Sequence, residues 1–245
     1  MFRYETRRFI RLRRCRPGDD QWVLTMENPE DHKPIIAIIG GTGDLGSGLA
    51  KGWGAAGYSI VLGSRSRDKA VAKAEELGTF ARGDDNVGAA RAGDVVVIAV
   101  PFANHEATLI EIREAVQGKI VVDAVVPLAP PKVWEVRVRP DGSAAEIAQN
   151  LLGPEVRVTS AFHNVGASKL HAGGKADCDV LVFGNDKAAR DTVIELAGTV
   201  TARGVDGGVL ANSAAAEALT AVLISINRRY KVPGAGIRIT GLSQD

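Results

Sequence analysis

The chain has 245 residues, 45% hydrophobic and 24% charged, so it can bury a large core and has the composition of a globular protein. Thirty basic and 29 acidic residues leave a net charge of +1, which excludes a general electrostatic attraction to nucleic acid or to a membrane surface. No uninterrupted apolar run is long enough to span a bilayer, and the two distant cysteines, Cys15 and Cys178, fit a reducing cytoplasm better than a disulfide framework.

Residues 1–32 hold most of the basic excess, with seven arginines among the first sixteen residues. An arginine-rich, acid-poor segment can be a mitochondrial presequence or a basic arm that contacts phosphate. Here the segment lacks helix caps and a regular amphipathic period, and Met26 stands where an alternative start of the protein is expected. We therefore predict a disordered extension without a function of its own.

From Ile35 onward, short β-branched runs alternate with longer helical stretches. The run 35–39 is apolar throughout, which predicts a strand buried on both faces of a parallel sheet. Further strands are predicted at 59–62, 94–100, 119–123, 157–162, 178–183 and 199–205, with a short strand pair at 134–138. Helices are predicted at 68–77, 143–152, 186–197 and 213–227, and the last is expected to be buried. This order predicts an α/β fold with a doubly wound, mostly parallel sheet of the Rossmann type and a small C-terminal α/β part.

A glycine-rich turn follows the first of these strands directly and opens a helix. Gly41, Gly43 and Gly46 have the G-x-G-x-x-G spacing that permits a tight turn, close backbone approach to a pyrophosphate and close contact between helix and strand. The free N–H groups of the following helix would point at the anion. The motif alone is weak, but the strand before it and the helix after it favour a dinucleotide site.

The end of the second strand predicts which dinucleotide is bound. A site that selects NAD usually has an acidic residue there for the ribose hydroxyls. This chain instead has Ser64 and Arg65, with Lys69 one helical turn further on. The arginine fork can bond two oxygens of a 2′-phosphate, and cations at a helix start suggest a bound anion. These residues therefore favour NADP over NAD.

With these features the chain resembles the NADPH-dependent F420 reductases, which pass hydride between NADP(H) and the deazaflavin coenzyme F420. The resemblance covers residues 34–242. It is carried by the segments Ile38–Gly46, Gly63–Arg65, Val100–Phe102, Ala161–Val165, Asn212–Ser213 and Gly236–Leu242. The C-terminal Gly-Ile-Arg-Ile-Thr-Gly-Leu is more specific than the glycine turn. The stretch 130–140 and the register of 102–105 depart from the family pattern.

The resemblance implies a site made of two parts. NADP would be held by Gly41, Thr42, Gly43, Asp44, Leu45, Gly46, Ser64, Arg65 and Lys69, with Val100 and Pro101 beside the nicotinamide. The deazaflavin would lie in a cleft formed by Val126, Pro127, His163, Val165, Ala167, Ala218 and Thr220. On this basis residues 33–152 would form the NADP-binding domain, and residues 153–245 would complete the deazaflavin cleft. The family form is typically a homo-oligomer, here expected to be a cytoplasmic homodimer with small-molecule partners and no nucleic-acid or membrane partner.

Hydride transfer between two ring carriers needs mainly stacking of the rings and exclusion of water, so no catalytic triad and no metal are expected. The four histidines form no pair at metal-ligand spacing. His163 ends a predicted strand and is the one candidate for a positioning or electrostatic role, with positioning favoured over acid–base work. Two alternatives stay open: an NADPH-dependent imine or carbonyl reductase, and a non-catalytic module that senses NADP(H).

Overall fold

The computed structural model describes residues 9–14, 22–27, 33–128, 130–137 and 139–242. It divides the chain into two compact units, Met1–Pro34 and Ile35–Asp245. In the first unit, β1 (Phe9–Arg14) and β2 (Trp22–Glu27) pair as an antiparallel hairpin. The sequence analysis assigned no strand to this extension, and the rest of residues 1–32 lies outside the described residues.

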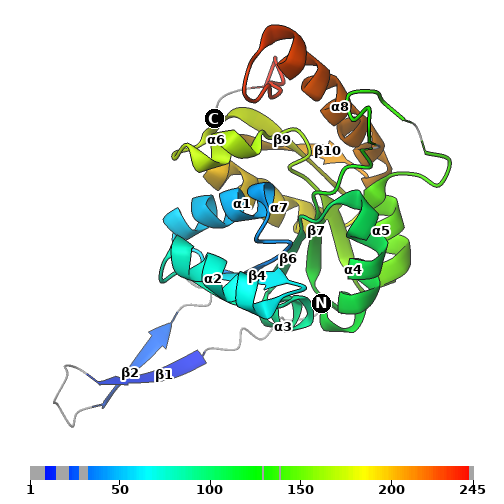
Figure 1. The fold of residues 1–245 in the computed structure, drawn as a ribbon. Helices are drawn as coiled ribbons and strands as arrows, with labels where there is room; N and C mark the ends of the chain where they lie inside the picture. The colour runs from blue at the N-terminus through cyan, green and yellow to red at the C-terminus, as the bar shows by residue number, and fades with distance from the viewer. Residues whose placement is uncertain (1–8, 15–21, 28–32, 129, 138, 243–245) are drawn as a thin grey trace. The chain divides into compact units, whose positions relative to one another are not determined.

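One eight-stranded sheet runs through the second unit, in the order β10-β9-β8-β7-β6-β3-β4-β5 (Figure 1). Neighbouring strands are parallel except β8 and β9, so β9 and β10 run against the other six. The predicted mostly parallel, doubly wound sheet is confirmed. The strands are β3 (Ile36–Ile39), β4 (Ile60–Ser64), β5 (Ala81–Asp85), β6 (Val95–Ile98), β7 (Ile120–Asp123), β8 (Arg157–Ser160), β9 (Ala176–Gly184) and β10 (Thr201–Gly208).

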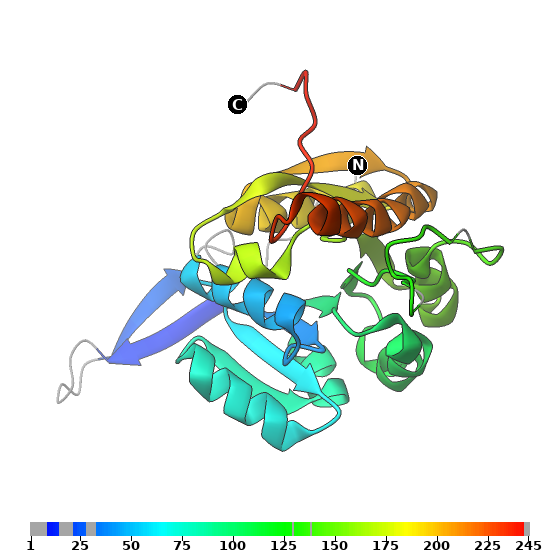
Figure 2. The ribbon, with the colours of Figure 1, turned by 45° about the horizontal axis from the view of Figure 1, so that its top comes forward.

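Helices cover both faces of this sheet (Figure 2). The core on one face includes residues of α1 (Asp44–Ala55), α2 (Arg67–Leu77), α6 (Ala167–His171) and α7 (Lys187–Val200). The core on the other face includes residues of α3 (Asn86–Ala92), α4 (His105–Ile112) and α5 (Ala144–Leu152). The last helix, α8 (Ser213–Tyr230), contacts α5 and β9.

The central strand β3 shows why an unbroken apolar run is needed here. Ile36 and Ile38 belong to one core, Ala37 and Ile39 belong to the other, and all four are fully buried. Successive side chains of a strand point to opposite faces, so a strand covered on both sides has no polar position. Trp53 of α1 is fully buried in the first of these cores. Its indole N–H is satisfied there, since it donates to the Leu196 carbonyl at 3.0 Å.

The strand order reverses at β3. The chain passes from β3 outward to β4 and β5, then returns to β6 on the other side of β3 and continues to β7 and β8. In an open α/β sheet, ligands bind beyond the carboxyl ends of the strands at such a switch point. The glycine turn after β3 and the segment Ala99–Pro101 after β6 both lie there.

Several elements differ from the sequence prediction. β5, α3, α4 and α6 were not predicted, and β5 (Ala-Arg-Gly-Asp-Asp) has no apolar pattern because it is the edge strand. The predicted strand pair at 134–138 is wrong for the described residues 134–137, which form turns and irregular chain without a partner strand. Asn212 precedes α8, but its side chain donates to the Gly207 carbonyl instead of capping the helix. The predicted helix at 143–152 is present as α5, and Ser143 and Glu146 form a capping box at its start.

The long helix α8 is less buried than predicted. Ser213, Ala216, Glu217, Ala221 and Leu223 are buried, whereas much of the remaining surface is half-buried or exposed. Within the described residues, the segment Leu210–Tyr230 is long and apolar enough to cross a membrane by length and composition alone. Such a segment is weak grounds for a membrane span, since core helices of globular proteins have the same composition.

Candidate functional site

The glycine turn after β3 is packed so closely that side chains would not fit at two of its positions. Gly40 has a φ of +84°, which favours glycine, and a Cβ there would lie 2.6 Å from the Ala99 carbonyl oxygen. At Gly46, the third glycine of the motif, a Cβ would lie 2.7 Å from the Gly40 carbonyl oxygen. The first turn of α1 can therefore pack directly on the loop, with the N–H groups at its start pointing into the site. This arrangement fits a pyrophosphate.

At the end of β4, Ser64 is half-buried and Arg65 is exposed. Both line the cavity that also borders Thr42 and Gly43 of the glycine turn. Lys69 is exposed on α2 and does not line this cavity; its backbone N–H donates to the Ser66 hydroxyl, which caps the helix. Of the three residues expected at a 2′-phosphate, two border the dinucleotide cavity directly.

That cavity has a volume of about 160 Å³ and is open to solvent. Val100 and Pro101 lie on its wall at the end of β6, as expected for the nicotinamide side. It also borders three polar side chains that were not predicted from the sequence, those of Asn86, Asn104 and Thr108. Asn86 is buried, and its amide donates to the Glu111 carboxylate at 2.9 Å. Asparagine directly after the polar edge strand was the available signal, but that strand was itself not recognised.

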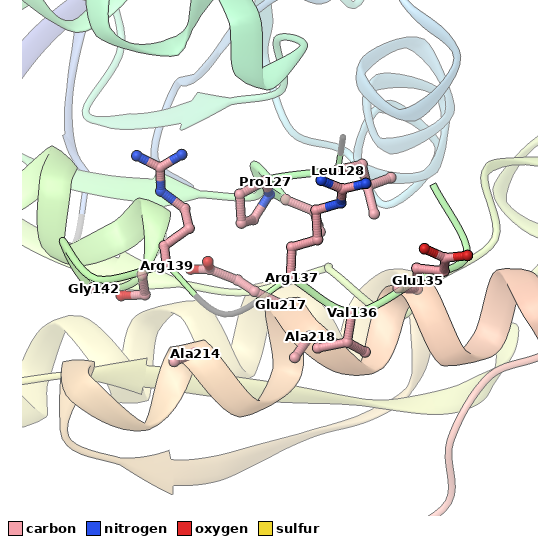
Figure 3. A pocket seen from close by; sticks show the side chains of 13 residues that line it. Pro127, Leu128, Glu135, Val136, Arg137, Arg139, Gly142, Ala214, Glu217 and Ala218 are labelled. Carbon is pink, nitrogen blue, oxygen red and sulfur yellow. The ribbon is translucent and has the colours of Figure 1, made fainter. Parts of the chain in front are cut away.

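A second cavity of about 160 Å³, also open to solvent, lies beyond the end of β7 (Figure 3). Three of the residues expected around a deazaflavin border it, namely Val126, Pro127 and Ala218. The other walls come from α8 and from the loop between β7 and α5. They include residues that the sequence analysis did not assign to a site: Leu128, Glu135, Val136, Arg137, Arg139, Gly142, Ser143, Ala214, Glu217 and Ala221.

The loop between β7 and α5 is held at two places by stacked cations. The guanidinium of Arg228 on α8 lies 3.6 Å from the ring centre of Trp134, and that of Arg139 lies 4.8 Å from the ring centre of Phe102. Such contacts stabilise by about 0.5–1 kcal/mol where they are exposed. Arg228 lies in the last turn of α8, so its contact with Trp134 links this helix to the loop.

The remaining expected residues lie behind the second cavity instead of on its wall. His163 is buried, and its Nε2 lies 3.2 Å from the Ser160 hydroxyl. The Thr220 hydroxyl donates to the His163 carbonyl at 2.9 Å, which joins this loop to α8. Val165 packs against the core and Ala167 begins α6. Burial lowers the pKa of His163 to about 4, although nearby Asp123 opposes the shift, so the ring is neutral at neutral pH.

Three further titratable side chains are buried next to these cavities. His105 Nε2 and Asp123 Oδ2 are 2.6 Å apart, and both residues are almost fully buried. Glu217 on α8 accepts hydrogen bonds from the backbone N–H groups of Ala144 and Ala145 at 2.9 and 3.3 Å. Burial raises the pKa of Glu217 to about 7, and the charge of Asp123 adds to the effect while the two N–H groups oppose it. Within the described residues, no group of three His, Cys, Asp or Glu could hold a metal ion.

The fold and the two cavities define a Rossmann-type protein that binds a nicotinamide dinucleotide and has a second ligand cavity at the end of the neighbouring strand. Residues 35–127 match the family model described as NADP oxidoreductase, coenzyme F420-dependent. The F420-dependent NADP reductase of Methanocaldococcus jannaschii is 41% identical over 221 residues, which cover 84% of this chain and 98% of that protein. The protein of the same name from Methanothermobacter marburgensis is 38% identical over 223 residues, covering 85% and 99%. This chain belongs to the family of F420-dependent NADP reductases.

Among solved structures, a hypothetical protein of Sinorhizobium meliloti, SMa0349, has a TM-score of 0.64 and 25% sequence identity. The match covers 76% of this chain and 90% of that one. It supports the Rossmann-like architecture of residues 35–245.

Proposed function

We propose that the protein is an oxidoreductase that transfers hydride between NADP(H) and the deazaflavin coenzyme F420. The observation that carries this proposal is the pair of cavities at the ends of β6 and β7, in a chain of this family. The two strands are neighbours and parallel, so Ala99–Pro101 and Val126–Leu128 leave the sheet at the same edge. Two rings bound there would be neighbours, as hydride transfer requires.

The first cavity suits NADP in shape and charge. Gly41 and Gly46 permit the tight turn and its packing on α1, and Gly43 would allow the close backbone approach to the pyrophosphate. Arg65 supplies a cation for the 2′-phosphate, with Ser64 as a hydrogen-bonding partner. Thr42, Gly43, Asp44 and Leu45 would lie along the pyrophosphate, and Lys69 would add long-range attraction from its exposed position. When bound, NADPH supplies the hydride from carbon 4 of its nicotinamide.

The second cavity suits a flat, largely apolar ring system. Val126, Pro127 and Ala218 give it apolar walls. Thr220 of α8, through its hydrogen bond to the His163 carbonyl, would hold the His163 loop against the helix that carries Ala218. Val165 and Ala167 would act through the position of that loop. We assign His163 a positioning role, because its ring is buried and neutral and its Nε2 is close to Ser160.

The protein itself does two things for the transfer. It holds the two rings in contact at about 3–3.5 Å between the reacting atoms. It also keeps water away from the reacting edge by means of the loop over the second cavity, which Trp134 and Arg228 fasten to α8. We further propose a cytoplasmic homodimer, supported by the exposed apolar side chains Val209 and Val222 near and on α8.

The test mixes the purified protein with oxidised F420 and NADPH and follows the loss of the deazaflavin absorbance, with NADH in a parallel reaction. We expect rapid bleaching with NADPH and weak bleaching with NADH. Binding of NADPH without bleaching would contradict the F420 proposal and leave both alternatives, the imine or carbonyl reductase and the module that senses NADP(H). A panel of imine and carbonyl substrates would then separate these two. Light scattering after gel filtration would test the dimer separately.

A further inference from the structure

Hydride transfer between NADPH and a deazaflavin also moves a proton. The nicotinamide loses hydrogen from carbon 4 with both electrons of the C–H bond, so it is oxidised. The deazaflavin ring gains that hydride on carbon and one proton on nitrogen, so it is reduced. In the opposite direction the same proton leaves. A side chain that borders the deazaflavin cavity and exchanges a proton near neutral pH could carry it.

Glu217 borders the proposed deazaflavin cavity and is nevertheless only 3% exposed (Figure 3). Its Oε2 accepts from the Ala144 N–H and its Oε1 from the Ala145 N–H, at the start of α5. The partial positive charge of a helix start stabilises a carboxylate. The side chain is therefore fixed in place at the wall of the cavity, and its negative form is supported by two donors.

The charges around Glu217 come from several elements. Asp123 at the end of β7 and His105 on α4 form a buried pair that acts on Glu217 electrostatically. The loop between β7 and α5 adds Arg137, Arg139 and Glu135 to the wall of the same cavity, and Glu146 lies in the first turn of α5.

In these surroundings the pKa of Glu217 is about 7, since burial and Asp123 outweigh the backbone donors. His105 Nδ1 is a second unusual feature: it is buried and has no hydrogen-bond partner within the described residues. The region behind the cavity is therefore a cluster of titratable groups, of which Glu217 is the member on the wall.

We propose that Glu217 is the catalytic residue that carries the proton of this reaction. The O–H bond of Glu217 breaks as an N–H bond forms on the deazaflavin ring, while the hydride arrives from NADPH. The carboxylate then regains a proton from solvent, and all steps reverse when reduced F420 is oxidised. The inference rests on the proposed function.

The experiment compares the full-length wild type with Glu217→Gln and with Glu146→Gln as a matched control. Glu146 belongs to the first turn of α5, the helix start that Glu217 of α8 contacts, but Glu146 borders neither cavity. Single-turnover reduction of F420 by NADPH is followed between about pH 5 and about pH 9. Infrared spectra of the free proteins, recorded over the same range, report the protonated carboxyl group independently of activity.

For the wild type we expect the rate of F420 reduction to fall above about pH 7, together with the infrared band of a buried protonated carboxyl group. Glu217→Gln should be slower by at least about tenfold, should lose that pH dependence and that band, and should bind NADPH as the wild type does. Glu146→Gln should keep the rate, the pH profile and the band.

A Glu217→Gln variant with the wild-type rate and pH profile would overturn the inference. If this variant does not fold, the wild type alone decides: a carboxyl band whose midpoint differs from that of the rate would equally overturn it. If the wild type did not reduce F420 at all, the proposed function itself would be contradicted. In that case the protein would still bind NADPH and still show the carboxyl titration, but without turnover.

Discussion

At the scale of single residues, we expect the end of β4 to determine which dinucleotide is preferred. Arg65 borders the dinucleotide cavity, whereas Arg67, two residues further on, pairs with Asp84 at 3.3 Å. The two arginines have the same charge and nearly the same place in the chain. They differ in whether the guanidinium is available to a ligand in the cavity, which makes them a matched pair for a test.

We expect Arg65→Ala to weaken NADPH binding by at least about tenfold, because charge-assisted hydrogen bonds to a 2′-phosphate contribute about 1.5–3 kcal/mol. NADH binding should change little, since NADH lacks that phosphate. Arg67→Ala should leave the ratio of the two affinities near its wild-type value. Titration calorimetry with both dinucleotides measures this, and an equal loss for NADPH and NADH would contradict the assignment.

His163 makes the stability of the protein depend on acid. Its pKa is about 4 in the folded protein, against an ordinary value of 6.5, so below about pH 6.5 the unfolded chain binds the extra proton first. Stability is therefore lost as the pH falls from about 6.5 to about 4, by up to about 3 kcal/mol, and above this window the group has no effect.

Urea unfolding at a series of pH values should show this loss in the wild type and not in His163→Gln, whose amide can still bond to Ser160. His171→Gln removes an exposed histidine and should keep the wild-type pH dependence. Parallel curves for the wild type and His163→Gln would show that His163 does not titrate as described.

At the scale of elements, the glycine turn and α1 act as one unit. Gly46→Ala would place a methyl group 2.7 Å from the Gly40 carbonyl oxygen and 2.8 Å from the Gly41 Cα, both backbone atoms. We expect the turn to shift, NADPH binding to weaken by about tenfold or more, and stability to fall by about 1–3 kcal/mol.

The control for this prediction is Gly198→Ala in α7. A Cβ there would meet no atom within 4 Å, and alanine favours a helix over glycine by up to about 1 kcal/mol. The control should be as stable as the wild type or more stable, with NADPH affinity unchanged. Fluorescence titration and thermal unfolding of both variants give the comparison; unchanged NADPH affinity in Gly46→Ala would contradict the packing argument.

At the scale of the whole second unit, the C-terminal segment is attached to a partly buried ion pair between β9 and β10 at the edge of the sheet. Asp179 of β9 is fully buried and accepts two bonds of 3.0 Å from Arg203 of β10 and one of 2.7 Å from the Ile239 N–H. Burial opposes ionisation, but these donors outweigh it and hold the pKa of Asp179 below its ordinary value. Ile239 belongs to the C-terminal Gly-Ile-Arg-Ile-Thr-Gly-Leu motif.

Arg203→Met should therefore destabilise the protein by about 3–5 kcal/mol, because it leaves the Asp179 carboxylate buried without its main partner. Lys187→Met breaks an exposed pair with Asp191 on α7 and should cost no more than about 0.5 kcal/mol. Denaturant unfolding compares the two. Equal, small losses would mean that the C-terminal segment is held by other contacts.

Much of the fold could be predicted because its signals are local. A few neighbouring residues are enough to predict the local backbone in several places. These are the apolar runs of β3 and β6, the glycine turn and the capping box of α5. β5 was not predicted, because an edge strand needs no apolar face. Residues 134–137 were wrongly predicted as a strand, because alternation of valine with charged residues forms a strand only where a partner strand exists.

The site divides in the same way. Short motifs and their order along the chain were enough to predict the phosphate-binding turn, the cation at Arg65 and the family. The folded structure was needed to show that His163 is buried, that Asn86 borders the dinucleotide cavity, and that Glu217 accepts hydrogen bonds from the start of α5. The physical reason is that desolvation and hydrogen bonding depend on neighbours distant in sequence, and these are set by the strand order and the crossovers between strands.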